Sequence, residues 1–123
     1  MTPRTAFKLI RLELAREPGH PDGDPGHAYR MLLPLDETGK IDPVAWKADP
    51  ARCRVARIDP EGEQIGQLEH GPGGRWFVNY ATGQGRSDVG FRFEDERFVP
   101  GEYVTIKRDD GEHTYRVVAQ QSV

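Results

Sequence analysis

The segment from Phe98 to Ala119 constrains the fold more than any other part of the chain. Its two halves alternate apolar and polar residues, and Asp110-Gly111 lies between them. An Asp-Gly pair between two alternating segments is the strongest short-range signal for a β-hairpin. We therefore expect a two-stranded antiparallel hairpin at this end of the chain.

The register of this hairpin follows from pairing the two strands outward from the Asp-Gly turn. That pairing predicts an apolar face built from two cross-strand pairs, Ile106 with Tyr115 and Val104 with Val117. The opposite face is then polar and contains Lys107 opposite Thr114 and Thr105 opposite Arg116. One apolar and one polar face are what a half-buried antiparallel sheet requires.

Short segments of strand type recur along the rest of the chain. We expect strands at residues 7–16, 27–35, 52–58, 63–70, 75–80 and 90–94, with a β-bulge near Leu9–Ile10 where the apolar parity changes. One helix is expected from Asp42 to Asp49, packed through Val44 and Trp46. The prediction is an all-β protein, a small antiparallel barrel or sandwich of about eight strands with one short helix, formed by residues 1–123 as a single β domain.

Three central strands share a predicted core face. Strand alternation places seven residues on it: Cys53, Val55, Gly66, Leu68, Trp76, Val78 and Tyr80. In the strand at residues 27–35, alternation likewise places Tyr29, Met31, Leu33 and Leu35 on one face. Cys53 therefore reads as a buried and inert thiol.

Charge and cysteine content limit the function classes. The net charge is −3, so the domain lacks a strong electrostatic attraction to nucleic acid or to an anionic membrane. The single cysteine gives no internal disulfide, and charged residues interrupt the N-terminal apolar residues where a signal peptide would need a continuous run. We expect a cytoplasmic protein with no membrane partner.

Three sequence blocks resemble a small bacterial all-β family of unknown function. They are Leu12-Glu-Leu-Ala-Arg16, the spaced residues Gly66, Trp76 and Tyr80, and Gly101-Glu-Tyr-Val-Thr-Ile106 followed by Tyr115-Arg-Val-Val118. The resemblance implies a single compact domain and brings with it no activity, ligand or catalytic residue.

The loop from His20 to His27 is the most metal-like segment. It contains four donor side chains, those of His20, Asp22, Asp24 and His27. A zinc site of His20, Asp22 and His27 would leave one position open, as catalytic zinc does, but the loop lacks cysteines and a recognised ligand spacing. We expect no metal and no cofactor, and retain a metal-dependent enzyme built on this loop as a second alternative.

Candidate ligand-binding residues come from basic and aromatic positions that lie together. Arg75 and Phe77 share one face of a predicted strand, Arg92 lies between two phenylalanines, and Arg86 lies in a glycine-containing loop suited to an anion. No serine elbow or catalytic triad is present in the sequence. We therefore expect a non-catalytic domain that binds a protein or a small ligand, with single-stranded nucleic-acid binding through Arg75, Phe77 and Arg92 as the first alternative.

Overall fold

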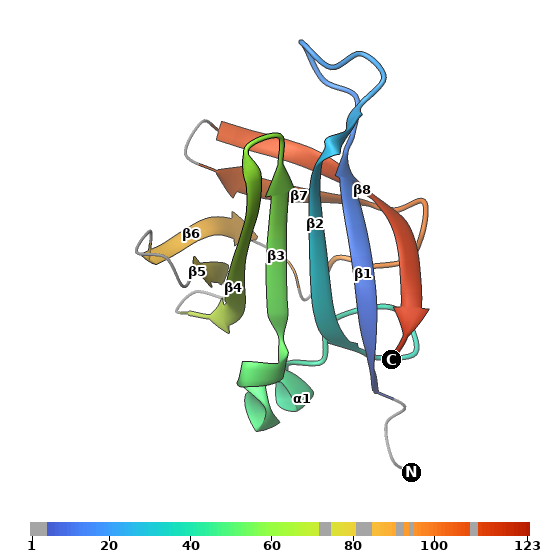
Figure 1. Ribbon diagram of the computed structural model, residues 1–123. Helices are drawn as coiled ribbons and strands as arrows, with labels where there is room; N and C mark the ends of the chain where they lie inside the picture. The colour runs from blue at the N-terminus through green and yellow to red at the C-terminus, as the bar shows by residue number, and fades with distance from the viewer. Residues whose placement is uncertain (1–4, 72–74, 81–84, 91–92, 94, 109–110) are drawn as a thin grey trace.

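Eight strands of the described chain pair in sequence order and close into an antiparallel barrel (Figure 1). The computed structural model describes residues 5–71, 75–80, 85–90, 93, 95–108 and 111–123. Its strands are β1 (Ala6–Leu14), β2 (Asp24–Leu35), β3 (Arg54–Asp59), β4 (Gly62–His70), β5 (Trp76–Tyr80), β6 (Gly85–Gly90), β7 (Tyr103–Arg108) and β8 (Gly111–Ser122). The predicted all-β class is confirmed. Of the two expected architectures, barrel and sandwich, the structure has the barrel.

The barrel closes through β1, which pairs with β2 on one side and β8 on the other. The β6–β7 ladder has one described pair, Val89 with Lys107. Next to it, Phe93 packs edge-to-face on Phe98 at 5.5 Å between ring centroids, and both side chains are buried. Only glycine fits at position 90, because a Cβ there would lie 2.2 Å from the Phe93 ring. Aromatic packing thus adds to the contacts of the barrel beside the described part of the β6–β7 ladder.

The C-terminal hairpin has the predicted faces but not the predicted register. Ile106 pairs with His113 and Val104 with Tyr115, two residues away from the expected partners. A shift of two residues keeps every side chain on its face, so Ile106, Val104, Tyr115 and Val117 are buried as expected. The displacement is already present at the last described pair, where Gly111 faces Arg108. Asp110, the other half of the expected Asp-Gly turn, lies outside the described chain.

Two further expectations were wrong in position. The irregularities of β1 lie between Arg11 and Leu12 toward β8 and between Glu13 and Leu14 toward β2, not near Leu9–Ile10. The sixth strand spans Gly85–Gly90, where a glycine-containing loop around Arg86 was expected. This segment pairs with β5, but its glycines and polar residues give only a weak sequence signal for a strand. Of the strand expected at residues 90–94, residues 91, 92 and 94 lie outside the described chain.

The interior of the barrel is a single apolar cluster. All seven residues of the predicted central core face are buried, and Trp76 and Leu68 are fully inaccessible. The expected inward residues of β2, namely Tyr29, Met31, Leu33 and Leu35, are buried too. Period-two alternation therefore identified these buried residues correctly.

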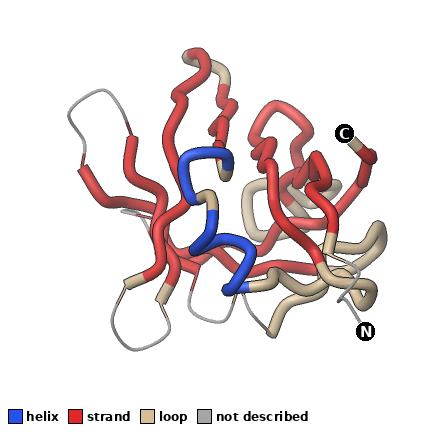
Figure 2. The backbone as a smooth tube through the Cα atoms, turned by 90° about the horizontal axis from the view of Figure 1, so that it is seen from below, coloured by secondary structure: helices blue, strands red, loops and turns tan. Residues whose placement is uncertain are grey.

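The lower end of the barrel is covered by the helix α1 (Pro43–Ala48) and the 3-10 turn η1 (Pro50–Arg52), which lie across it in Figure 2. Asp42 caps the helix by accepting hydrogen bonds from the backbone N–H groups of Val44 and Ala45. Trp46 packs on the core and donates from Nε1 to the Leu68 carbonyl at 2.9 Å. Val44 was expected to pack but is 78% exposed, because it lies on the outer side of the helix. No helix in the described part of the chain has the length and apolarity to span a membrane.

Candidate functional site

A buried carboxylate, Asp88, organises the polar part of the interior. It is 3% exposed and is the one charged residue in the described chain that is buried outright. Tyr29 donates its hydroxyl hydrogen bond at 2.8 Å, and Tyr80 donates a second one. Arg57 donates from Nη1 to both carboxylate oxygens at 3.1 Å. The charge of Asp88 is therefore neutralised by a salt bridge and hydrogen-bonded by two phenols, as a buried carboxylate requires.

A second guanidinium, that of Arg108, lies beside this group. Its Nη1 donates to the Tyr115 hydroxyl at 3.5 Å. The Tyr115 ring packs edge-to-face on Tyr29, with 5.0 Å between the centroids. Arg108 is close enough to Arg57 for the two positive charges to repel each other. The cluster thus holds two guanidiniums and one carboxylate.

Burial and mutual contact shift the pKa values of these groups. Burial raises the pKa of Tyr29 well above its usual value, and the negative charge of Asp88 raises it further. Burial and Asp88 likewise raise the pKa of Tyr80. Burial opposes the charged form of Arg57, but the Asp88 carboxylate outweighs it and raises the pKa of that guanidinium. At neutral pH the phenols are therefore neutral donors and both arginines remain charged.

Part of the hydrogen-bonding capacity of the cluster is unused. Among the described residues, no acceptor lies within hydrogen-bonding distance of the buried Nε atoms of Arg57 and Arg108, and no donor reaches Oε1 of Gln64. These three side chains line one pocket of about 440 Å³ together with His27 and the β3–β4 turn. We name this pocket the upper opening; Figure 1 shows the β3–β4 turn and the start of β8 at the end of the barrel opposite α1.

None of the residues of this cluster was selected from the sequence. The available signal was strand parity, because the alternation that turns Val55 and Ile106 inward also turns Arg57 and Arg108 inward. Tyr29 and Tyr80 were predicted to be core residues, and a buried tyrosine hydroxyl needs a partner. The partner, Asp88, lies in the segment that was expected to be a loop.

The four residues selected from the sequence do not form a described site. Arg75 is exposed just before β5, and the half-buried Phe77 lies against Gly71 and opposite Glu69 in the β4–β5 ladder. Arg86 pairs through its backbone with Asn79, and its side chain lies outside the described residues. Arg92 also lies outside them. The acidic neighbour of Phe77 does not favour a phosphate backbone at this face.

The metal-like loop is partly assembled. The structure brings His20, Asp24 and His27 together, with one donor atom of each within 4.8 Å of the others. Asp22, which the sequence suggested beside the two histidines as a candidate ligand, is not in this group; it lines an outer hollow that Asp24 also lines.

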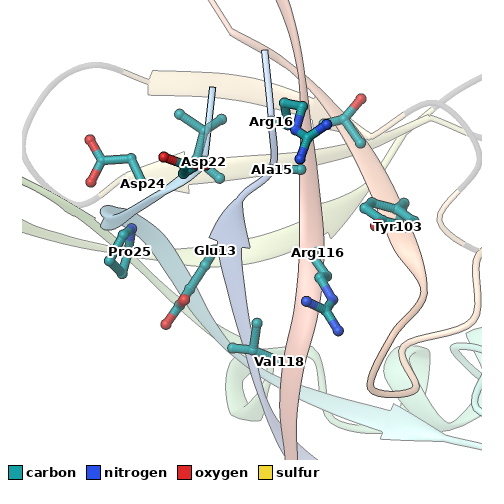
Figure 3. A pocket seen from close by; sticks show the side chains of 12 residues that line it. Glu13, Ala15, Arg16, Asp22, Asp24, Pro25, Tyr103, Arg116 and Val118 are labelled. Atoms are coloured by element: carbon teal, nitrogen blue, oxygen red, sulfur yellow. The ribbon is translucent and has the colours of Figure 1, made fainter. Parts of the chain in front are cut away.

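That hollow is a groove of about 710 Å³ on the outside of the barrel (Figure 3). Figure 3 shows Glu13 projecting from β1, and Arg116 and Val118 from β8. The groove is lined by both acidic and basic side chains, and Arg116 is exposed to solvent. A ligand would therefore gain little from charged groups that water already solvates. The upper opening differs because its unused donors are buried.

Comparison with known proteins yields no match to a family model, to a curated protein or to a solved structure.

Proposed function

We propose that the protein is a non-catalytic binding module whose upper opening takes a small molecule through one carboxylate or phosphate group. The observation that carries this proposal is the excess of guanidinium over carboxylate in the buried cluster, where Asp88 pairs with Arg57 and also acts electrostatically on Arg108. An anion adds the missing negative charge. Guanidinium groups match the planar oxygens of such anions through parallel N–H donors.

Unpartnered buried donors give a free-energy reason for an anion to bind in this pocket. Each buried donor without a partner costs about 1–3 kcal/mol. A hydrogen bond to a charged group contributes about 1.5–3 kcal/mol. The unused Nε atoms of Arg57 and Arg108 therefore offer favourable interactions that become available only when an acceptor enters.

The rim of the upper opening limits the charge of the ligand. Asp59, which is half-buried, and Glu61, which is exposed, also line the pocket. Their carboxylates repel a second negative group, while the arginines attract the first one. The rim thus supports a ligand with a single acidic group, bound with that group innermost.

Thermal denaturation in different anions tests the proposal. Inorganic phosphate and acetate are titrated separately at constant ionic strength, with chloride as the reference anion. At a concentration one hundred times the Kd, a ligand that binds only the folded state stabilises it by about 2.7 kcal/mol. We expect a saturable rise in the melting temperature with phosphate, acetate or both, and none with chloride.

Two arginine variants identify the site. Arg108→Gln removes one guanidinium but leaves the Arg57–Asp88 pair intact, so the rise should be lost or reduced severalfold. Arg54→Gln is the matched control, since Arg54 lies on the same strand as Arg57 but is exposed. Equal stabilisation by all three anions, no stabilisation by any of them, or an unchanged rise in Arg108→Gln would contradict the proposal.

A further inference from the structure

We infer that His20, Asp24 and His27 form a zinc-binding site at the junction of the β1–β2 loop and β2. The inference does not depend on the proposed anion site, because its donors are not the two arginines, although His27 also lines the upper opening. It reverses the sequence-based expectation that no metal is bound.

The separations of the donor atoms suit a zinc ion. Oδ2 of Asp24 lies 3.5 Å from Nδ1 of His20 and 3.6 Å from Nε2 of His27. Zinc–ligand bonds of about 2.0–2.1 Å in a tetrahedron place neighbouring ligand atoms about 3.3 Å apart. Each imidazole nitrogen is therefore within a few tenths of an ångström of the required distance from the carboxylate, and the two nitrogens lie within 4.8 Å of each other.

An irregular stretch of β2 puts Asp24 and His27 on the same side. β1 pairs Glu13 with Ala28 and then Leu14 with Asp24, so residues 25–27 are inserted opposite a single step of β1. In a regular strand, two side chains three positions apart project to opposite faces. Here the backbone N–H of Gly26 donates to Oδ1 of Asp24 at 2.8 Å, which turns the chain and leaves Oδ2 facing both imidazoles.

The backbone of the preceding loop holds His20 in place. Its N–H and C=O groups exchange hydrogen bonds with Glu17 at 2.8 and 3.0 Å, and its carbonyl also accepts from Gly23. Gly23 has φ = 74°, and a Cβ there would lie 2.5 Å from the Leu14 carbonyl oxygen, so the turn requires glycine. The donor set is therefore arranged before a metal arrives.

The chemistry of the donors selects the class of metal. Imidazole nitrogen suits zinc, copper and nickel, whereas calcium and magnesium prefer oxygen ligands. Two imidazoles and one carboxylate supply three of the four positions of a zinc ion and leave one for water or another ligand. Figure 3 shows the Asp24 carboxylate directed away from Tyr103 and Arg116, although Asp24 also lines the outer groove.

Calorimetric titration of the untagged full chain with zinc chloride tests the inference. We expect one ion per chain with a micromolar or tighter Kd, and no binding of calcium chloride. Asp24→Asn keeps an oxygen for the Gly26 hydrogen bond but removes the negative ligand, so zinc binding should weaken at least tenfold. Asp22→Asn is the matched control and should bind within twofold of the wild type.

The histidines are tested by His20→Gln and His27→Gln, each checked for folding by circular dichroism. Each variant should weaken zinc binding at least tenfold. If His27→Gln, whose residue lies in β2, fails to fold, His20→Gln alone provides the test. The absence of a one-to-one zinc isotherm, or binding that is unchanged in both Asp24→Asn and His20→Gln, would overturn the site.

Discussion

Tyr29 and Asp88 lie 59 residues apart in the chain, and the Tyr29 hydroxyl donates a 2.8 Å hydrogen bond to the Asp88 carboxylate inside the barrel. The contact joins β2 to β6, which are not neighbours in the sheet. Asp88 also accepts from Tyr80 and Arg57, so one side chain links four strands across the interior. We propose that this arrangement leaves the guanidiniums of Arg57 and Arg108 available to an external anion.

Asp88→Asn should destabilise the fold by about 3 kcal/mol, because it leaves the buried guanidinium of Arg57 without its counter-charge. Asp88 has φ = 52°, and asparagine tolerates this left-handed conformation as well as aspartate does. The substitution therefore changes the charge with little backbone strain. Urea denaturation measures the loss, and the exposed Asp22→Asn should stay within about 0.5 kcal/mol of the wild type. Equal midpoints for the two variants would refute the role of Asp88.

Ile106→Asp should unfold or aggregate the protein, whereas Thr105→Asp should be tolerated. Ile106 is 1% exposed and its neighbour Thr105 faces solvent on the same strand. An unpaired charge in an apolar interior costs several kcal/mol, comparable with the whole stability of a domain. Thermal melts of the two purified variants give the comparison, and similar midpoints would show that the faces of β7 are assigned incorrectly.

Stability should fall as the pH rises above about 10, the ordinary pKa of tyrosine. Burial raises the pKa values of Tyr29, Tyr80 and Tyr115 in the folded state, so this stabilisation is complete below the unfolded pKa and is lost above it. Each phenol that stays protonated in the folded state alone contributes a slope of about 1.4 kcal/mol per pH unit. Urea midpoints between pH 8 and 11 measure the slope, which should be shallower in Tyr80→Phe. An identical slope in that variant would contradict the assignment.

Cys53 should resist modification in the native protein. Burial, followed by the negative charge of Asp49, raises the pKa of its thiol to about 11, and the side chain is inaccessible. Only the thiolate reacts with iodoacetamide or a disulfide reagent. Labelling at pH 8 should therefore be slow until urea unfolds the chain, and rapid stoichiometric labelling of the folded protein would show that the position is accessible.

The sequence predicted the faces of the strands better than the pairing between them. Alternation identifies an inward residue such as Ile106 or Val55 from its neighbours alone, and a two-residue slip of the hairpin leaves that assignment intact. The register depends on which residues form the turn. The Asp110-Gly111 signal predicted partners on β8 that lie two positions beyond the observed ones. β6 was mislocated because its residues lack the β-branched and aromatic character of a typical strand.

The functional residues were harder to predict because their partners are distant in sequence. Nothing near Asp88 indicates that Tyr29 and Arg57 will meet it, since those contacts exist only once the barrel closes. The loop donors His20 and His27 were noticed, but choosing Asp24 over Asp22 required the irregular pairing of β1 with β2. Arg57 and Arg108 were recognisable as charged residues at inward positions, which is the signal to seek in other chains of this kind.

The most direct measurement of anion binding follows the Nε–H resonances of the arginines by ¹H–¹⁵N NMR during titration with inorganic phosphate at constant ionic strength. Arg57 and Arg108 have buried Nε groups without an acceptor, whereas Arg54 is exposed. We predict saturable shifts of the first two signals with a common Kd, and no saturable shift of the Arg54 signal. Signals of Arg57 and Arg108 that stay unchanged with phosphate, and again with acetate, would contradict the account.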